Sequence, residues 1–524
     1  MDITTITQLM AAGELAPPRA ADEAGAAAAR LGELAGLTVY PDSIAACAGT
    51  VYFLGRREAA KFLGILCLPQ DMAQVAFAGR RHSLDLDGRP AALMLCPTDH
   101  ANARALRAAL PFTAPCVLGL QLSIGCGDRL GLATPGHVHA VRRGHMAPIF
   151  AQQSIREMTR TRRTPEEVLD AASWGVFQAG WRGGFGADAD HLKTADDVNR
   201  CVAAGYTFYT IDPGDYVEST ADHGEPSLVR ERMSTLPWSE LETTAEDLRR
   251  AYLARPFDAD GVRMAFDEDQ LWRAAAKYGA AIAHTLVMYR QLSARMDGRP
   301  FELEMSVDET DTPTTPEQHY FVARELQRLR VPLVSLAPRF VGRFEKGVDY
   351  IGDLAAFEED AARQAAIARA MGPYKLGLHS GSDKFSIYPI MARVAGQLVH
   401  LKTAGTSYLE AVRVLASVDP PLFREIAAFA RQHYAEDSRT YHVSADAARM
   451  PAPEQLADGE LATLLDTLDG RQVLHVTFGS VLTATKPEGG YLFRDRLLAA
   501  LQANEEVYTA ALAAHFERHI APFS

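Results

Sequence analysis

The stretch GADADHLKT, residues 186–194, places Asp188, Asp190 and His191 close together, directly after a glycine-rich turn. A carboxylate beside an imidazole can divide two tasks, because one group can bind a metal ion while the other moves a proton. Adjacent strand residues point to opposite faces, but both can reach one cavity where the chain turns at a strand end. We therefore predict that Asp190 and His191 belong to one site. The alternative for Asp190 is a carboxylate that caps the following helix.

Two further histidines, His379 in LHSGSDK and His400 in VHLKT, also stand near the ends of apolar stretches. Imidazole nitrogens together with a carboxylate suit a divalent ion such as Zn²⁺, Mn²⁺, Ni²⁺ or Co²⁺. We predict His191, His379 and His400 as metal ligands, and the alternative for each is an isolated, hydrogen-bonded histidine. Glu304 lies inside the apolar stretch FELEMSV, where an unpaired carboxylate would be costly, so we predict that it also belongs to the site.

Other polar side chains near the same stretches could bind a substrate. The cations among them would give the local positive charge that a small anion needs in a protein whose net charge is -13. For each cation alone, a structural or solvated ion pair is the alternative. The predicted substrate-binding residues are Asp128, Arg129, Arg339, Ser382, Lys384 and Lys402.

Regular elements must bring these separated residues together. From residue 116 onward, apolar stretches that end in polar or glycine-rich turns alternate with amphipathic helical patterns, which is typical of parallel βα units. Eight such units predict an α/β fold, a (β/α)8 barrel (TIM barrel), whose active site lies at the carboxyl ends of the strands. The predicted strands are 116–124, 148–154, 185–191, 207–213, 301–307, 331–339, 374–382 and 397–405.

The rest of the chain surrounds this predicted barrel, which spans 113–415 and contains a helical insertion at 214–300. Residues 1–112 predict an N-terminal α/β extension, whose alanine-rich segment 16–36 is a loose or helical lead-in. Residues 416–524 predict a mainly helical C-terminal region. It also contains two strand-like stretches, TYHVSAD and RQVLHVTFGSVLTA.

Composition excludes several classes of protein. Hydrophobic residues make up 48% and charged residues 23%, which are values of a globular protein. The acidic balance without a basic stripe argues against a nucleic-acid partner, and no apolar run or leader pattern indicates a membrane. Six scattered cysteines favour reduced thiols, so we expect a cytoplasmic enzyme. The oligomeric state stays open, a homo-oligomer included.

The order of the motifs resembles class II aldolases over roughly residues 115–415. DADHLKTADDVNRCVAAGYTFYTIDPGD resembles their Asp-His strand, FELEMSVDETDTPTTPEQ their glutamate strand, LGLHSGSD their metal-histidine strand, and VHLKT their last strand. Carried over residue by residue, this resemblance implies that Asp190 is an acid/base group and that His191 and His379 are metal ligands. It implies that Glu304 is a second acid/base group or a ligand.

The third metal ligand departs from the aldolase pattern. Where the aldolases have a ligating AHG at the end of the sixth strand, this chain has SLAPRFVG. His400, at the place of an active-site Asn in the aldolases, is therefore our first choice. His442 and His475 are the reserves, and either can instead belong to the core.

More closely, GADADHLKT, LHSGSDKFSIYP, HLKTAGTSYLEA and LHVTFGSVL resemble the tagaturonate epimerase family, over most of the chain. This resemblance implies a metal-dependent isomerase that interconverts D-tagaturonate and D-fructuronate in hexuronate catabolism. The inverted carbon is not next to the ketone, so its hydrogen is not acidic, and retro-aldol cleavage with reclosure is favoured over deprotonation. The alternatives are an aldolase acting on a keto-sugar acid and a non-catalytic sugar-acid sensor, which the clustered acid, base and ligand groups disfavour.

Overall fold

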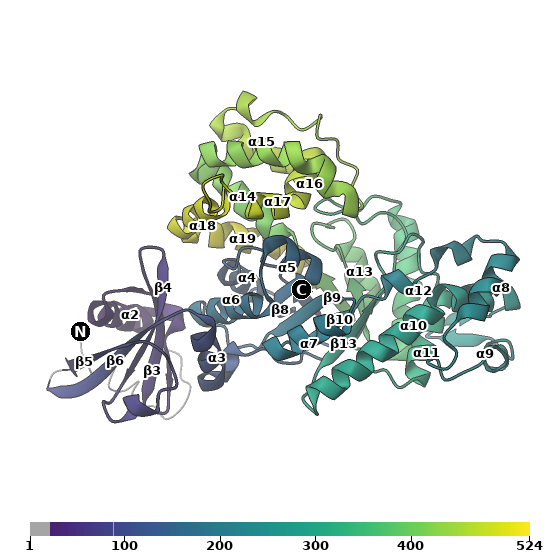
Figure 1. Cartoon of the computed structure of the whole chain (residues 1–524), viewed down its shortest axis with the longest axis horizontal. Coiled ribbons are helices and arrows are strands. Elements are labelled where there is room, and N and C mark those ends of the chain that lie inside the picture. The colour runs from purple at the N-terminus through teal and green to yellow at the C-terminus, as the bar shows by residue number, and fades with distance from the viewer. Residues whose placement is uncertain (1–20, 87) are drawn as a thin grey trace.

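The computed structural model describes residues 21–86 and 88–524, and its centre is a closed barrel of eight parallel strands (Figure 1). The predicted (β/α)8 barrel is therefore confirmed. Its strands are β7 (Ser123–Gly125), β8 (Ala147–Ser154), β9 (Gly186–Leu192), β10 (Phe208–Ile211), β13 (Glu302–Ser306), β14 (Ser335–Ala337), β15 (Lys375–Leu378) and β16 (Val399–Lys402). The strands are almost wholly buried because helices cover the outside of the barrel and side chains fill its inside.

The first strand differs from its prediction. The apolar stretch 116–124 predicts a full strand, but β7 begins only at Ser123. Gly119 has a φ of 61°, a left-handed conformation that glycine adopts readily, and the chain turns there. The backbone N–H groups of Leu118 and Gly119 donate to the carboxylate of Glu302, which fixes this turn beneath the barrel.

Helices follow the strands along the chain, and several begin with the local signals that the sequence carries. The barrel helices are α4 (Thr134–Val141), α5 (Ile155–Thr161), α6 (Pro165–Gln178), α7 (Ala195–Ala204), α11 (Pro316–Arg328), α12 (Leu354–Met371), α13 (Tyr388–Ala395) and α14 (Thr406–Val418). A capping box formed by Thr164 begins α6, and Thr194 begins α7 in the same way. In such a box the side chain satisfies a free N–H of the first turn, which fixes where each strand-end loop stops.

Three additions lie on different sides of the barrel in Figure 1. The N-terminal addition consists of a six-stranded antiparallel sheet and two helices, α2 (Ala21–Ala35) before the strands and α3 (His100–Ala109) after them. Its strands are β1 (Thr38–Val39), β2 (Ala45–Cys47), β3 (Thr50–Arg57), β4 (Ala60–Cys67), β5 (Arg80–Leu86) and β6 (Arg89–Pro97). The predicted lead-in forms helix α2 from residue 21, and its earlier part lies outside the described residues. The insertion contains α8 (Pro226–Thr235), α9 (Ala245–Tyr252), the hairpin β11 (Phe257–Ala259) and β12 (Val262–Met264), and the long α10 (Glu268–Met296). Helix α10 also belongs to the barrel, because it packs between α7 and α11 as the helix that follows β10.

The C-terminal addition is built from helices, and both strand-like stretches predicted there are wrong. Residues 440–446 contain no strand, and 471–484 fall mainly in α16 (Leu468–Val476) and α17 (Phe478–Thr483). Their almost continuous apolar run is buried among helices on several sides, a pattern that cannot be told from a buried strand by periodicity alone. The other helices here are α15 (Pro420–Asp437), α18 (Arg494–Ala503) and α19 (Glu505–Ile520).

All six cysteines carry free thiols. Over 21–86 and 88–524, every helix is too short or too polar to cross a membrane. The hydrophobic residues instead form one large core through the barrel and the C-terminal helices, with separate smaller cores in the N-terminal sheet.

Candidate active site

Two adjoining cavities open at the carboxyl ends of the barrel strands. The inner cavity has a volume of about 50 Å³, and its wall includes Asp190, His191, His379 and Lys402. The outer cavity has a volume of about 300 Å³ and lies between the β13 and β14 connections and residues 440–444. Lys346, Ser380 and Tyr441 line both cavities, so they mark the boundary between the two.

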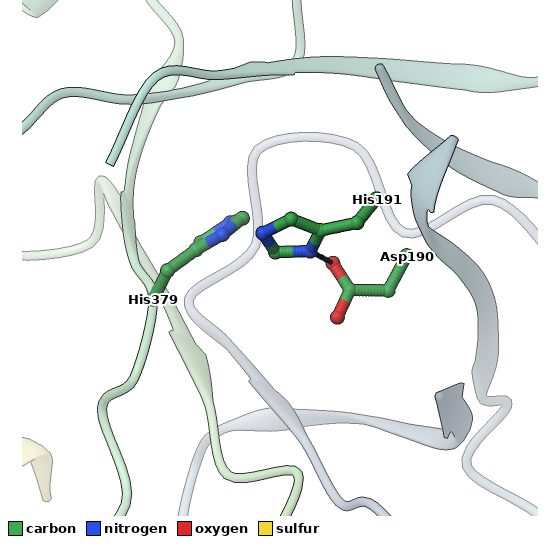
Figure 2. Close-up of side chains that lie close together, drawn as sticks. All are labelled: Asp190, His191 and His379. Atoms are coloured by element: carbon green, nitrogen blue, oxygen red, sulfur yellow. Dashed lines mark hydrogen bonds and ion pairs between the residues drawn. The ribbon is translucent and has the colours of Figure 1, made fainter. Parts of the chain in front are cut away.

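A bulge at the end of β9 turns Asp190 and His191 toward the same cavity. Tyr209 of β10 pairs with Ala189, but Ile211 pairs with Leu192, so β9 contains one extra residue at this point. His191 has a φ of 55°, which breaks the alternation of side chains along the strand. As a result, Nδ1 of His191 lies 2.7 Å from Oδ1 of Asp190 (Figure 2).

The donor set around these two residues fits a divalent metal ion. Asp190, His191 and His379 each offer one ligand atom, and these atoms lie within 4.8 Å of one another. The two imidazole rings lie side by side with their centroids 5.1 Å apart and their planes tilted by 52° (Figure 2). Nε2 of His191 is buried and has no hydrogen-bond partner among the described residues, which leaves it free for a ligand. Oδ1 of Asp308 lies 3.7 Å from that nitrogen and 3.2 Å from Nδ1 of His379.

Lys402 is the centre of the charge network beneath this group. Its Nζ lies 2.8 Å from Asp190, 2.9 Å from Asp188 and 2.7 Å from Glu304, and its side chain is 3% exposed. Burial alone would raise the pKa of Asp190, but the positive charges of His191 and Lys402 outweigh it and hold that pKa well below its usual value. Burial would lower the pKa of Lys402, yet the three carboxylates raise it. Lys402, which we predicted to bind substrate, lines the inner cavity, and its charge neutralises the three buried carboxylates.

Glu304 orients a predicted metal ligand from below. Its Oε1 lies 2.7 Å from Nε2 of His379, its side chain is completely buried, and it does not line the inner cavity. Burial would raise the pKa of Glu304, but Lys402 and His379 hold it well below the usual value. Gln152 has a similar role at the other side, since its amide donates to Oδ2 of Asp190 at 2.9 Å.

His400, predicted as the third ligand, is not brought to the other two histidines. It precedes Lys402 by two residues on β16, so it points inward as Lys402 does but one layer deeper in the barrel. Its Nδ1 lies 3.0 Å from Oγ of Ser123, and its Nε2 lies 3.9 Å from Asp188. Of the two reserves, His442 lines the outer cavity and His475 lines the inner one, and neither joins the potential metal-binding group.

The predicted substrate-binding residues separate into two sets. Arg129 and Ser382 line the inner cavity and Arg339 lines the outer one, although Arg129 is already paired with Glu157 at 2.8 Å and 2.6 Å. Asp128 lines neither of these two cavities, and its carboxylate accepts backbone N–H groups of its own loop. Lys384 also lines neither of them; it is completely buried, and its Nζ donates to backbone carbonyls, including that of Glu345 at 2.8 Å.

The sequence prediction missed several residues that line the cavities, among them Arg156, Asp308, Glu309 and Lys346. Arg156, Asp308 and Glu309 follow β8 and β13 directly, so their place after a strand end is the signal that could have found them. Lys346 lies in the long connection between β14 and α12, and no local pattern marks it.

A second cluster of histidines supports the loop that carries His379. Nε2 of His515 lies 2.7 Å from the carboxylate of Asp383, and the backbone N–H of Asp383 donates to Nε2 of His519 at 3.1 Å. Arg471 also contacts Asp383, at 2.7 Å. Because these groups satisfy one another, the cluster is explained as an anchor between α19 and the end of β15.

The fold and the site together define a (β/α)8-barrel enzyme with buried carboxylates, histidines and a lysine clustered at the carboxyl ends of its strands. The sequence model of the tagaturonate epimerase family matches residues 40–523. The chain therefore belongs to the tagaturonate epimerase family, and it is an isomerase.

Individual relatives agree with this family. The chain is 45% identical over 426 residues to the tagaturonate/fructuronate epimerase of Thermotoga maritima, a match that covers 81% of this chain and 85% of the relative. The native crystal structure of the fructuronate-tagaturonate epimerase of Cohnella laeviribosi superposes with a TM-score of 0.87 at 38% identity, covering 95% of this chain and 99% of that one. A crystal structure of the same protein with one glycerol gives the same TM-score at 37% identity.

Proposed function

We propose that the protein interconverts D-tagaturonate and D-fructuronate, the two compounds in the names of its relatives. The observation that carries this proposal is the group of Asp190, His191 and His379 in the wall of the inner cavity. It combines a carboxylate in its ionised form with two imidazoles that suit a divalent ion. The membership in an epimerase family supports the choice of reaction.

The positions of the functional groups in the substrate favour a retro-aldol route. The two keto-acids differ at the carbon two positions from the ketone carbon, where the hydrogen is not acidic. If a base takes the proton of the hydroxyl on that carbon, the bond toward the ketone half breaks and its electron pair forms an enediolate. The resulting aldehyde turns its other face, the bond forms again, and the new alkoxide takes back a proton.

The residues of the site divide this work in our proposal. His191 and His379 would hold the divalent ion, with an oxygen of Asp308, which lies 3.7 Å and 3.2 Å from their ring nitrogens. A bound ion supplies Lewis-acid polarisation of the ketone, which favours the enediolate. Asp190 accepts the hydroxyl proton, because Lys402 and His191 keep it ionised. Glu304 keeps the ring of His379 oriented rather than taking a proton from the substrate.

The role of Asp190 is tested by Asp190→Asn, with Asp196→Asn as the control on the exposed first turn of α7. We expect kcat for D-tagaturonate to fall by about 100-fold or more in Asp190→Asn, because general acid–base catalysis contributes about 10² to 10⁴. Asp196→Asn is expected to behave as the wild type. Near-wild-type turnover of Asp190→Asn would refute the proton-transfer role.

Metal dependence and the route are tested on the full chain after treatment with a chelator. Divalent ions are added back one at a time, and D-fructuronate and three-carbon fragments are followed. Metal-dependent fructuronate without fragments supports the epimerase, whereas accumulating fragments indicate an aldolase. The retro-aldol route predicts that deuterium on the inverted carbon is retained during turnover, and its exchange with water would instead indicate direct deprotonation.

A further inference from the structure

Two cations and one carboxylate meet at the boundary between the inner and outer cavities. Arg156 follows β8 and lines the inner cavity, and Lys346 lines both cavities. The carboxylate of Glu309 bridges them: it lies 2.9 Å and 3.3 Å from the two terminal nitrogens of Arg156, and 3.2 Å from Nζ of Lys346. Oγ of Ser380 accepts a further hydrogen bond from Lys346 at 2.6 Å.

The two cations are held in place independently of Glu309. The guanidinium of Arg156 lies over the ring of Tyr441, 4.9 Å from its centroid, and Ser380 holds Lys346 from the inner side. Glu309, in contrast, lies on the connection after β13, and over the described part of the chain its side chain hydrogen-bonds only with these two cations. Another carboxylate can therefore replace that of Glu309 without loss of any other contact.

The ligand that matches this arrangement is a carboxylate at the end of a short sugar chain. We propose that Arg156 and Lys346 form the subsite for the substrate carboxylate, and that Glu309 occupies this subsite in the free enzyme. This proposal rests on the proposed function, in which the keto-acid enters with its ketone end toward His191 and His379.

The chemistry of the proposed route gives the subsite a purpose. Retro-aldol cleavage leaves the carboxylate on the aldehyde half, which no longer has a covalent bond to the ketone half. Two charge-assisted bonds to that carboxylate keep the fragment in the cavity, while rotation about the remaining carbon–carbon bonds lets the aldehyde present its other face. The subsite thus favours reclosure over release of fragments.

The test compares steady-state kinetics of the full-length wild type, Arg156→Gln and Lys346→Gln with D-tagaturonate. We expect KM to rise by about 10- to 100-fold in each variant, the loss expected for a hydrogen bond between charged groups, with a much smaller change in kcat. Arg160→Gln is the matched control, because Arg160 lies over the same Tyr441 ring at 4.7 Å but lines neither cavity. Its KM is expected to stay within twofold of the wild type.

Glu309→Gln separates the two parts of the proposal. It removes the competing carboxylate, so KM for D-tagaturonate is expected to fall several-fold, and a rise in KM would show that Glu309 does not occupy the subsite. Unchanged KM in both Arg156→Gln and Lys346→Gln, or a loss of kcat alone, would overturn the subsite. Failure of the proposed function is seen separately, because the wild type would then not interconvert the two keto-acids at all. Circular dichroism and melting curves check that each variant folds.

Discussion

The substitution Lys402→Met tests how the barrel tolerates its buried carboxylates. Lys402 is the shared counter-charge of Asp188, Asp190 and Glu304, all within 2.9 Å of its Nζ, and it is 3% exposed. Removing one partner of a buried ion pair costs about 3–5 kcal/mol, because the remaining charge is left without compensation in a medium of low dielectric constant. We expect the free energy of unfolding to fall by at least about 3 kcal/mol.

Urea denaturation at neutral pH in the presence of a chelator measures this loss, since a bound cation would otherwise offset it. Lys193→Met is the matched control: Lys193 also pairs with two carboxylates, those of Asp215 at 2.8 Å and Asp212 at 3.8 Å, but its side chain is 45% exposed. Such a surface pair contributes about 1 kcal/mol or less. The reasoning is refuted if Lys402→Met loses no more stability than Lys193→Met.

The loss of stability in Lys402→Met should depend on pH, and the sign of this dependence follows from the pKa shifts of the carboxylates. In the wild type the pKa values of Asp190 and Glu304 are held low, so the stability they contribute is present at neutral pH and is lost as the pH falls. Without Lys402 these carboxylates bind protons at a higher pH, which removes the uncompensated charge. The difference between wild type and Lys402→Met should therefore shrink on acidification, and a difference that grows toward low pH would contradict this account.

Gly405→Ala should lower kcat/KM and the melting temperature, because an added Cβ would lie 1.9 Å from Nε2 of His475 in the wall of the inner cavity. Unchanged kinetics would show that the imidazole of His475 moves aside without affecting the site. Burial lowers the pKa of His137 and of His319 to about 4. Because the unfolded chain binds these protons at a higher pH, each histidine should remove roughly 3 kcal/mol from the free energy of unfolding as the pH falls from 6.5 to 4. In His137→Asn or His319→Gln the midpoint of urea denaturation should therefore fall less steeply over that range. Added Zn²⁺ or Mn²⁺ should raise the melting temperature of chelator-treated wild type but not of His379→Ala, and an equal rise in both would place the ion elsewhere.

Much of the site was predictable because its motifs are local. Asp190, His191 and His379 each stand at the end of an apolar stretch, and the geometry of a parallel barrel brings strand ends together whatever the intervening sequence. The same argument extends to Asp308 and Glu309 after β13. Lys346 was not predictable, because it comes from a long connection that is held by side chains of the C-terminal helix α16: Arg471 donates to the carbonyl of Gly347 and Gln472 to the carboxylate of Glu345.

The structure departs from these predictions for a common physical reason, which is that a sequence shows the type of a side chain but not its depth or its partners. His400 and Lys402 both point into the barrel from β16, but they lie in different layers. His400 therefore contacts Ser123, whereas Lys402 contacts Asp190. Lys384 and Asp128 look like substrate-binding residues by type, yet backbone groups satisfy them. Residues 471–484 have an apolar run typical of a strand, yet burial among helices makes them helical.

The sequence by itself determined the barrel, its strand order along the chain and the residue types of the proposed acid, base and metal-binding groups, because these depend on local periodicity and on strand ends. Only the tertiary structure decided which groups meet: the bulge that aims Asp190 and His191 at one cavity, the three carboxylates around Lys402, and the placement of Glu309 between Arg156 and Lys346. These contacts join residues far apart in the chain, and their energies depend on burial and distance, which no single segment encodes.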